Sequence, residues 1–432
     1  MPCGHTAAWP PCPLTACVLP SSSIPAPLTQ GRNSPRVMIF MLSLLMGLQP
    51  LSTDLYLPAM PALSDEFGVP VSKAQYTLSA MLLAYGISQL LWGPLSDRFG
   101  RRPVLLWGLG AYVLASVGCT WASSLGWLVF ARMCQGAALG AAVMTARAVV
   151  RDRHSPAEGA RVMSQVLTGL GLIACMSAPV GGLLSHLLDW RAALAALAVF
   201  SALTLGVVLW RFEETLASRR LNALEPREMV RTWLRIGLHP RFLAFSAVAS
   251  ASNAGLFTYL ATSSFVLIRL HGMSQLAYGF CMSSMSLCYV LGTVCCRQGL
   301  KRVGLQRTLD VGGALSLGAS LLLAGLYLAE VQSIWAVVLP LNLFMFSHGI
   351  HQPCSQMGAI APFPEAAGTA AALNGFCMTL SAFLMGLWLG QQADGSALPL
   401  VQGMLFWGMC LAVGAWVLVR RLGMPPPEPA PK

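Results

Sequence analysis

The sequence has few charged residues. Asp, Glu, Lys and Arg together make up 10% of its 432 residues, whereas 56% of the residues are hydrophobic. Because a soluble domain normally carries about 25% charged residues, most of this chain has no face that needs water. The composition excludes an ordinary soluble domain and predicts helices of about 20 apolar residues that cross a membrane.

The sequence also lacks metal and redox motifs. None of its 13 cysteines forms a CxxC pair, so we expect no metal, no cofactor and cysteines that act as small hydrophobic residues. The net charge of +11 does not predict a nucleic-acid partner, because the basic residues recur in short clusters between apolar runs. Such clusters encode membrane topology.

The apolar runs predict an all-α polytopic membrane protein with twelve transmembrane helices. Spanning helices tolerate the Gly and Pro within these runs because neighbouring helices and water satisfy the freed backbone groups. The predicted spans are residues 37–62, 73–95, 103–121, 126–150, 159–186, 190–211, 240–268, 274–298, 307–328, 332–360, 367–391 and 397–420.

A charged link divides the spans into two sets of six. A short repeat, in which Arg98-Phe99-Gly100 aligns with Arg302-Val303-Gly304, supports two parallel halves. The predicted parts are a disordered cytoplasmic tail at 1–36, a six-helix bundle at 37–211, a cytoplasmic linker at 212–239, a second six-helix bundle at 240–421 and a cytoplasmic tail at 422–432.

The basic residues sort to one side of the predicted membrane. The other side has only Lys73, Arg191 and Arg269. Basic residues favour the cytoplasmic side, so we expect both termini and the middle link in the cytoplasm.

Several motifs resemble those of the major facilitator superfamily. GPLSDRFGRRPV at 93–104 is similar to the signature loop between its second and third helices, and ARMCQGAALGAA at 131–142 looks like its fourth-helix motif. SAPVGG at 177–182 resembles the antiporter motif of the fifth helix, although Ala174 and Ala178 stand where glycines are usual.

The first predicted span resembles that of one particular group within this superfamily. Its end, PLSTDLYLPAMPAL at 50–63, looks like that of the bicyclomycin and chloramphenicol resistance exporters, the Bcr/CflA group. The resemblance implies two six-helix bundles around a central cavity. It also implies proton-driven antiport of drugs across a bacterial inner membrane, with small molecules, protons and lipid as partners.

Two charges lie deep within predicted spans. Asp54 is the acidic one and Arg132 the basic one, and counting residues from the span ends places them at similar depth. Ionisable residues within a membrane are functional candidates by default. Burial favours the neutral form of a carboxyl group, so we expect Asp54 to load and release protons and Arg132 to tune it. The alternative is a static ion pair.

Further residues are candidates around this pair. Gln135 lies on the same helix face as Arg132 and is a candidate cavity hydrogen-bonder, and Tyr56 is a candidate for an aromatic drug pocket. At the cytoplasmic end of the second span we expect a gating charge network, with Asp152 as a partner for Arg98. The network residues are Asp97, Arg98, Arg101 and Asp152, while Arg101 has lipid phosphate as an alternative partner.

The remaining candidates concern packing. Gly136 and Gly140 form a GxxxG pair that lets helices approach closely, and Pro179 with Gly181 and Gly182 is expected to bend the fifth helix. In the second half, polar residues within spans are expected mainly to form interhelical hydrogen bonds, although His348 and His351 also have the spacing of a proton shuttle.

Three other functions are alternatives to proton-coupled export. A proton-independent facilitator or metabolite exporter shares the packing motifs and differs in the role of Asp54. An enzyme needs a catalytic constellation, and a channel usually shows rings of like charge or a repeated filter; neither is visible in the sequence. We therefore predict a monomeric transporter without catalytic residues.

Overall fold

The computed structural model describes residues 34–154, 156–216, 224–392 and 395–423. The predicted tails therefore lie almost entirely outside the described residues. Secondary structure in the described part of the chain is helical. The first half contains α1 (Pro35–Asp54), the 3₁₀ turn η1 (Leu57–Ala59), α2 (Met60–Glu66), α3 (Val71–Ala74), α4 (Tyr76–Phe99), α5 (Arg101–Thr120), α6 (Leu125–Arg153), α7 (Pro156–Leu187) and α8 (Trp190–Arg211).

The second half follows a short linker helix, α9 (Pro226–Gly237). Its elements are α10 (Pro240–Ser264), the π-helical turn η3 (Phe265–Leu270), α11 (Gln275–Arg302), α12 (Gly304–Leu328), α13 (Trp335–Ile360), η4 (Pro364–Ala366), α14 (Ala367–Gln391), α15 (Leu398–Val413) and its continuation η5 (Gly414–Gly423). Each predicted span corresponds to one long helix or to a helix with its continuation, and α1 begins at Pro35 rather than at residue 37.

Eleven of these helical stretches have the length and the apolar composition of a membrane span, counted over the described residues. The remaining long helix, α13, is also long enough, but polar residues interrupt it. Its His348 and His351 are 4% and 0% exposed. Because neighbouring helices enclose these side chains, α13 does not need the apolar composition of a lipid-facing helix.

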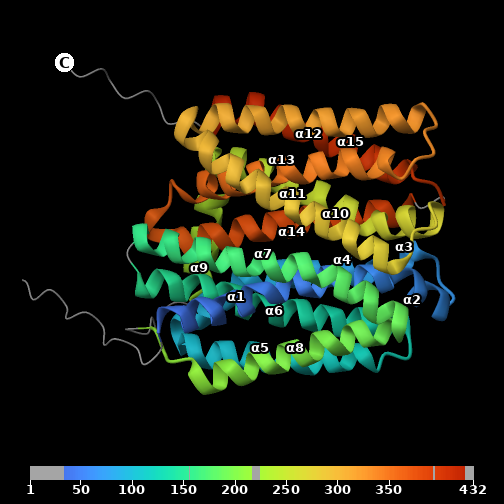
Figure 1. Cartoon of the computed structure of the whole chain (residues 1–432). Coiled ribbons are helices and arrows are strands. Elements are labelled where there is room, and N and C mark those ends of the chain that lie inside the picture. The colour runs from blue at the N-terminus through green and yellow to red at the C-terminus, as the bar shows by residue number, and fades with distance from the viewer. Residues whose placement is uncertain (1–33, 155, 217–223, 393–394, 424–432) are drawn as a thin grey trace, which may run out of the picture.

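The long helices run side by side in two groups (Figure 1). The helices of the first half pack mainly on one another, as do those of the second half. The two groups meet where α7 lies against α11 and where α4 lies against α14. The site described below lies between these two contacts.

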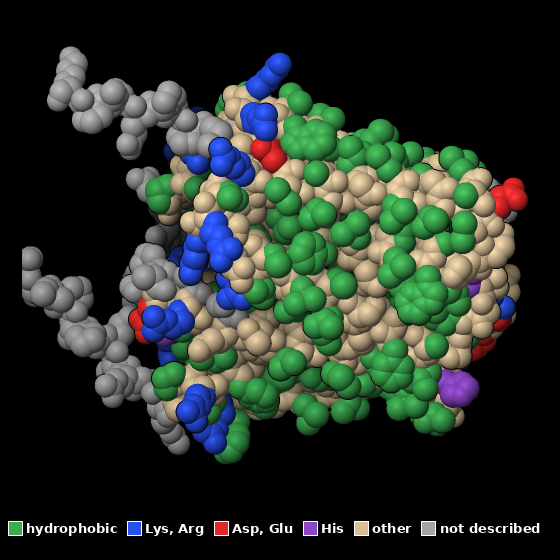
Figure 2. Space-filling model, turned by 45° about the horizontal axis from the view of Figure 1, so that its top comes forward, with side chains coloured by type: hydrophobic (Ala, Val, Ile, Leu, Met, Phe, Trp, Pro, Cys, Tyr) green, Lys and Arg blue, Asp and Glu red, His purple; other side chains and the backbone are tan. Residues whose placement is uncertain are grey.

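The surface has an apolar band between two polar ends (Figure 2). Large apolar side chains point outward within the band; Leu114 and Leu203, for example, are 75% and 66% exposed. Such a surface is stable in contact with lipid and not with water. Lys and Arg side chains gather at one end, which we call the basic end. The helix α2 lies at the opposite end (Figure 1), where its Glu66 pairs with Arg191 of α8 and its Asp65 pairs with Arg269 of η3.

Candidate substrate cavity and charge networks

The first membrane helix is broken at its functional end. The helix α1 ends at Asp54 and the chain continues through η1 into α2. Pro58 causes the break, because a proline has no N–H for the carbonyl of the residue four positions earlier, which is Asp54. Discontinuous helices of this kind place polar groups and free backbone ends at binding sites within membranes.

Asp54 faces a cavity of about 210 Å³ between the two halves. Gln49, Thr53 and Asp54 line it from α1, and Asn253, His348 and Gln352 line it from the second half. The other lining residues are mostly apolar or aromatic: Pro50, Leu82, Leu170, Gly171, Ala174, Leu256, Phe257, Tyr259, Leu260, Met282, Met285, Ser286, Tyr289, Val290, Met345 and Thr379. An apolar pocket with a few convergent polar groups is typical of a small-molecule site.

The carboxylate of Asp54 has no cationic partner among the described residues. Its Oδ1 accepts a hydrogen bond from Thr53 Oγ1 at 2.7 Å. The ion pairs of the described chain all lie elsewhere. Asp54 is therefore available to a proton or to a ligand in the cavity.

Arg132 lies behind the break in α1 rather than in the cavity. The side chain is 0% exposed. Its Nη2 donates to the carbonyl oxygen of Ser52 at 2.9 Å, and its guanidinium lies 4.4 Å from the centre of the Tyr56 ring. The last carbonyls of a helix carry partial negative charge, and a cation there stabilises the helix end. Arg132 thus holds the end of α1 from which Asp54 projects.

Gln135 extends this contact to α5. It accepts from Arg132 Nη1 at 2.7 Å and donates to Ser116 Oγ at 2.7 Å. Ser116 in turn donates to the carbonyl of Tyr112, whose hydroxyl bonds Ser52 Oγ. The resulting network joins α1, α5 and α6 and leaves little freedom for Arg132 to reorient.

The structure therefore brings together Arg132, Gln135 and Tyr56, while Asp54 points elsewhere. Asp54 and Arg132 do not form the static ion pair in this conformation. The guanidinium of Arg132 instead contacts Ser52, Gln135 and Tyr56. Tyr56 does not line the cavity either; it is buried, and its hydroxyl bonds Thr77 Oγ1 at 3.0 Å.

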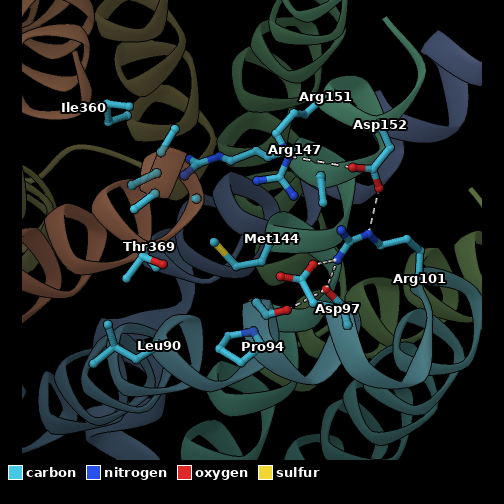
Figure 3. A pocket seen from close by; sticks show the side chains of 18 of the residues that line it. Leu90, Pro94, Asp97, Arg101, Met144, Arg147, Arg151, Asp152, Ile360 and Thr369 are labelled. Atoms are coloured by element: carbon cyan, nitrogen blue, oxygen red, sulfur yellow. Dashed lines mark hydrogen bonds and ion pairs between the residues drawn. The ribbon is translucent and has the colours of Figure 1, made fainter. Parts of the chain in front are cut away.

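A charge network occupies the basic end of the first half (Figure 3). Arg101 Nη1 lies 2.6 Å from Asp97 Oδ1, and Arg101 Nε lies 2.9 Å from Asp152 Oδ2. Arg101 Nη1 also donates to Ser96 Oγ at 2.5 Å. The predicted pairing of Asp152 with Arg98 is wrong: Arg98 lies outside the network, with its guanidinium 5.6 Å from the Phe99 ring centre. Arg101 does not face lipid, since it is 2% exposed.

Glu214, which the sequence did not single out, completes this network from the linker. Its carboxylate accepts from the backbone N–H groups of Arg101 at 2.9 Å and of Arg102 at 3.1 Å. An anion is favourable there because the first N–H groups of α5 have no partner within the helix. Gly100, which has a φ of 105°, allows the carboxylate to approach because glycine has no Cβ. A Cβ at this position would lie 2.5 Å from Glu214 Oε2 and would collide with it.

A second cavity, of about 640 Å³, opens next to this network. Asp97, Arg147 and Asp152 line it from the first half, and Thr369 and Ala372 line it from α14. This cavity lies between the two halves at the basic end. At the opposite end they are joined, since Arg269 of η3 binds the Asp65 carboxylate of α2 and Gln75 Nε2 donates to the Ala261 carbonyl at 2.6 Å.

The predicted packing residues lie at close helix contacts. A Cβ on Gly136 would overlap the carbonyl oxygen of Met81 in α4, and one on Gly140 would overlap Ser88. Around Pro179, which lies inside α7, a Cβ on Gly181 would overlap the Leu55 carbonyl and one on Gly182 the Gln275 carbonyl. The α7 motif therefore touches both the α1 break and the second half.

The two histidines of α13 have separate surroundings. His348 Nδ1 lies 2.7 Å from Ser252 Oγ beside the cavity, whereas His351 Nε2 lies 3.2 Å from Ser316 Oγ. Among the polar residues of the second half, Asn253, His348 and Gln352 line the central cavity, whereas Asn342, His351 and Asn374 do not. Phe257 and Tyr259 also line it, and Tyr85 and Phe376 do not.

Two groups of membrane-spanning helices with a cavity between them match the general plan of secondary transporters. The chain belongs to the Major Facilitator Superfamily, whose family model matches residues 42–386. The family is one of transporters, which confirms the expected class and the expectation that the chain is not an enzyme.

Several proteins with similar sequences are named for drug resistance. Multidrug resistance protein D of Escherichia coli is 29% identical over 345 residues, which cover 78% of this chain and 84% of that protein. A chloramphenicol resistance protein of Pseudomonas aeruginosa is 28% identical over 77% of this chain and 78% of its own length. A bicyclomycin resistance protein homolog of Haemophilus influenzae is 25% identical over 88% and 95%. These relatives confirm the resemblance to the Bcr/CflA group.

Solved structures confirm the fold. A human organic anion transporter superposes with a TM-score of 0.67 at 19% identity, covering 90% of this chain and 100% of that one. A D-xylose–proton symporter gives a TM-score of 0.68 at 16% identity, covering 89% and 98%. The prediction of a polytopic all-α membrane protein of this superfamily is therefore correct.

Proposed function

We propose that this protein exports small amphipathic drugs in exchange for protons across a bacterial inner membrane. The observation that carries the proposal is the position of Asp54. It is a carboxyl group at a helix break, without a cationic partner among the described residues, and it faces a mostly apolar cavity between two halves. A carboxyl group within a membrane is costly, and proton relays are a principal use of one.

The relatives support the substrate class. Proteins named for multidrug, chloramphenicol and bicyclomycin resistance share about a quarter or more of their residues with this chain over most of its length. The cavity agrees with such substrates, because methionine side chains adapt to different apolar shapes and Met282, Met285 and Met345 line it.

Alternating access would come from rocking the bundle at 37–211 against the bundle at 240–421. The positive-inside rule puts the basic end in the cytoplasm, together with both termini and the linker at 212–239. The conformation described above would then be the one that loads substrate from the cytoplasm. The α7 motif with Pro179 would serve as the hinge, because it contacts both halves.

Within this cycle each charged group has one role. The ionised Asp54 binds a neutral or cationic substrate from the cytoplasm, and its protonation on the outside releases the substrate. Deprotonation toward the cytoplasm resets the site. Arg132 is a positioning residue that holds the end of α1. The network of Asp97, Arg101 and Asp152 holds the ends of three helices together and favours one conformation over the other.

A drug-susceptibility screen in an efflux-deficient host tests the proposal. The host expresses the wild-type chain or Asp54→Asn, with and without a protonophore. We expect resistance to chloramphenicol or related compounds that both the substitution and the protonophore abolish. Resistance that survives both would instead indicate the proton-independent facilitator, and resistance to none of the compounds would contradict drug export.

A further inference from the structure

The wall of the central cavity opposite Asp54 carries two polar side chains that the proton cycle does not use. His348 and Gln352 both line the cavity. They are four residues apart on α13, so they lie one above the other on the same face of the helix. His351, on the same helix, bonds Ser316 of α12 and does not line the cavity.

The surroundings of His348 determine what its free nitrogen offers. Ser252 Oγ lies 2.7 Å from His348 Nδ1, and this is the only hydrogen bond of that hydroxyl to a described residue. A serine hydroxyl can donate its proton to Nδ1 or accept one from an Nδ1–H, so Nδ1 is engaged in either tautomer and Nε2 is the ring nitrogen left for a ligand. The Tyr289 ring, 5.4 Å away between centroids and tilted by 36°, holds the imidazole in place. His348 Nε2 is thus held in a fixed position, where it donates or accepts according to which ring nitrogen carries the proton.

Gln352 offers the complementary group. Its Oε1 is buried and has no hydrogen-bond partner among the described residues. Buried polar atoms are nearly always bonded in native proteins, and an orphan calls for an explanation. Either orientation of the amide presents one donor and one acceptor, so a ligand that both donates and accepts satisfies it.

We propose that His348 and Gln352 form a subsite for an uncharged carboxamide group of the transported compound. A carboxamide carries one acceptor and one donor, so its C=O and N–H can pair with His348 Nε2 and with the Gln352 side-chain amide in either imidazole tautomer. The apolar remainder of the ligand lies against Met282, Met285 and Met345. This inference rests on the proposed function, because it takes the central cavity as the place where substrate binds.

Equilibrium binding to the purified full-length protein tests the subsite. The probes are N-benzylbenzamide and benzyl benzoate. They have the same two rings and a carbonyl, and the ester has an oxygen atom in place of the amide N–H. We expect the wild type to bind the amide about tenfold tighter, which is the gain from bonding an otherwise unpartnered buried acceptor. Of the two variants Gln352→Met and His348→Phe, the one that removes the acceptor of the ligand N–H should bring the ratio of the two Kd values close to one.

The histidine variants separate the two hydrogen bonds. The other of the two variants Gln352→Met and His348→Phe should weaken both probes and keep their ratio, because both ligands have the carbonyl, and the pair of results therefore assigns the His348 tautomer. His348→Gln, whose amide nitrogen can reach the position of Nε2, should restore part of the affinity. His351→Gln is the matched control and should change neither Kd by more than about twofold. Size-exclusion elution as a single monodisperse peak verifies that each variant is folded.

Three results would overturn the subsite: equal binding of amide and ester by the wild type, an unchanged ratio in both Gln352→Met and His348→Phe, or no binding of either probe. Proton exchange is measured separately, as drug-dependent proton release that requires Asp54. If proton release occurs without amide selectivity, the subsite is wrong and proton-coupled export stands. If amide selectivity occurs without proton release, the subsite stands as a binding site and the coupling is wrong.

Discussion

Arg269 should control how firmly the end opposite the basic end is closed. Its guanidinium reaches from the second half to the first, where it binds the Asp65 carboxylate and donates to the Pro61 carbonyl at 3.3 Å. Arg269→Gln removes the charge from this contact. If the two halves rock against each other, the substitution should increase the population that is open at this end.

The size of the effect follows from the exposure of the pair. The side chains of Arg269 and Asp65 are 41% and 64% exposed, so solvent screens their attraction and the ion pair is worth about 0.2–1 kcal/mol. The hydrogen bond to Pro61 contributes about 0.5–1.5 kcal/mol. Together they amount to about 1–2 kcal/mol, which changes the ratio of closed to open molecules about 5- to 30-fold.

Single-molecule fluorescence transfer can measure this ratio. Fluorophores are attached through bio-orthogonal amino acids at positions 188 and 328, which belong to different halves and are 71% and 79% exposed. Arg191→Gln is the matched control, because Arg191 pairs with Glu66 at 2.6 Å with comparable exposure, but within one half. The reasoning is refuted if Arg269→Gln leaves the distance distribution unchanged, or if Arg191→Gln shifts it equally.

Two further predictions concern stability, measured by thermal unfolding in detergent. Gly136→Ala should destabilise the protein by about 1–3 kcal/mol, because the new Cβ would overlap the Met81 carbonyl, whereas Gly206→Ala, with open space around its Cβ, should not destabilise it; equal losses would contradict the close contact of α4 with α6. Arg101→Gln should cost about 3 kcal/mol, because it leaves Asp97 and Asp152 together without their cation. The neighbouring exposed Arg98→Gln should stay within about 0.5 kcal/mol, and a loss as large as that of Arg101→Gln would refute the assignment of the network.

The fold was largely predictable because each span needs about 20 apolar residues, whatever it packs against. The sixth and eleventh spans, 190–211 and 367–391, have the same bounds in the structure. The depth of Asp54 and Arg132 was predictable for the same reason, since rise per residue converts counting into distance. Arg132 indeed reaches the Ser52 carbonyl, two residues from Asp54.

Counting residues along a span does not predict the direction in which a side chain points. Arg98 and Arg101 are close in sequence, yet one lies on the surface and the other is buried between two carboxylates. Asp54 lines the central cavity, whereas Arg132 contacts the Ser52 carbonyl and the Tyr56 ring outside it. These outcomes depend on how each helix is rotated about its axis, which many distributed contacts determine together.

The sequence alone also did not predict contacts between residues that are far apart along the chain. Glu214 lies 113 residues from the Arg101 N–H that it accepts from, and nothing in its local sequence distinguishes it from other linker carboxylates. The part of His348 in the cavity wall depends on Ser252 and Tyr289 from two other helices. The i, i+4 spacing of Asp97 and Arg101 was a usable signal for their ion pair.

The central claim is that substrate and proton compete for Asp54. Proton release from the purified protein in weakly buffered detergent solution, followed with a pH-sensitive dye as chloramphenicol is added, tests it most directly. We predict that the wild type releases protons in a saturable manner and that Asp54→Asn still binds the drug but releases none. Equal proton release from Asp54→Asn, or drug binding to the wild type without proton release at any pH, would contradict the account.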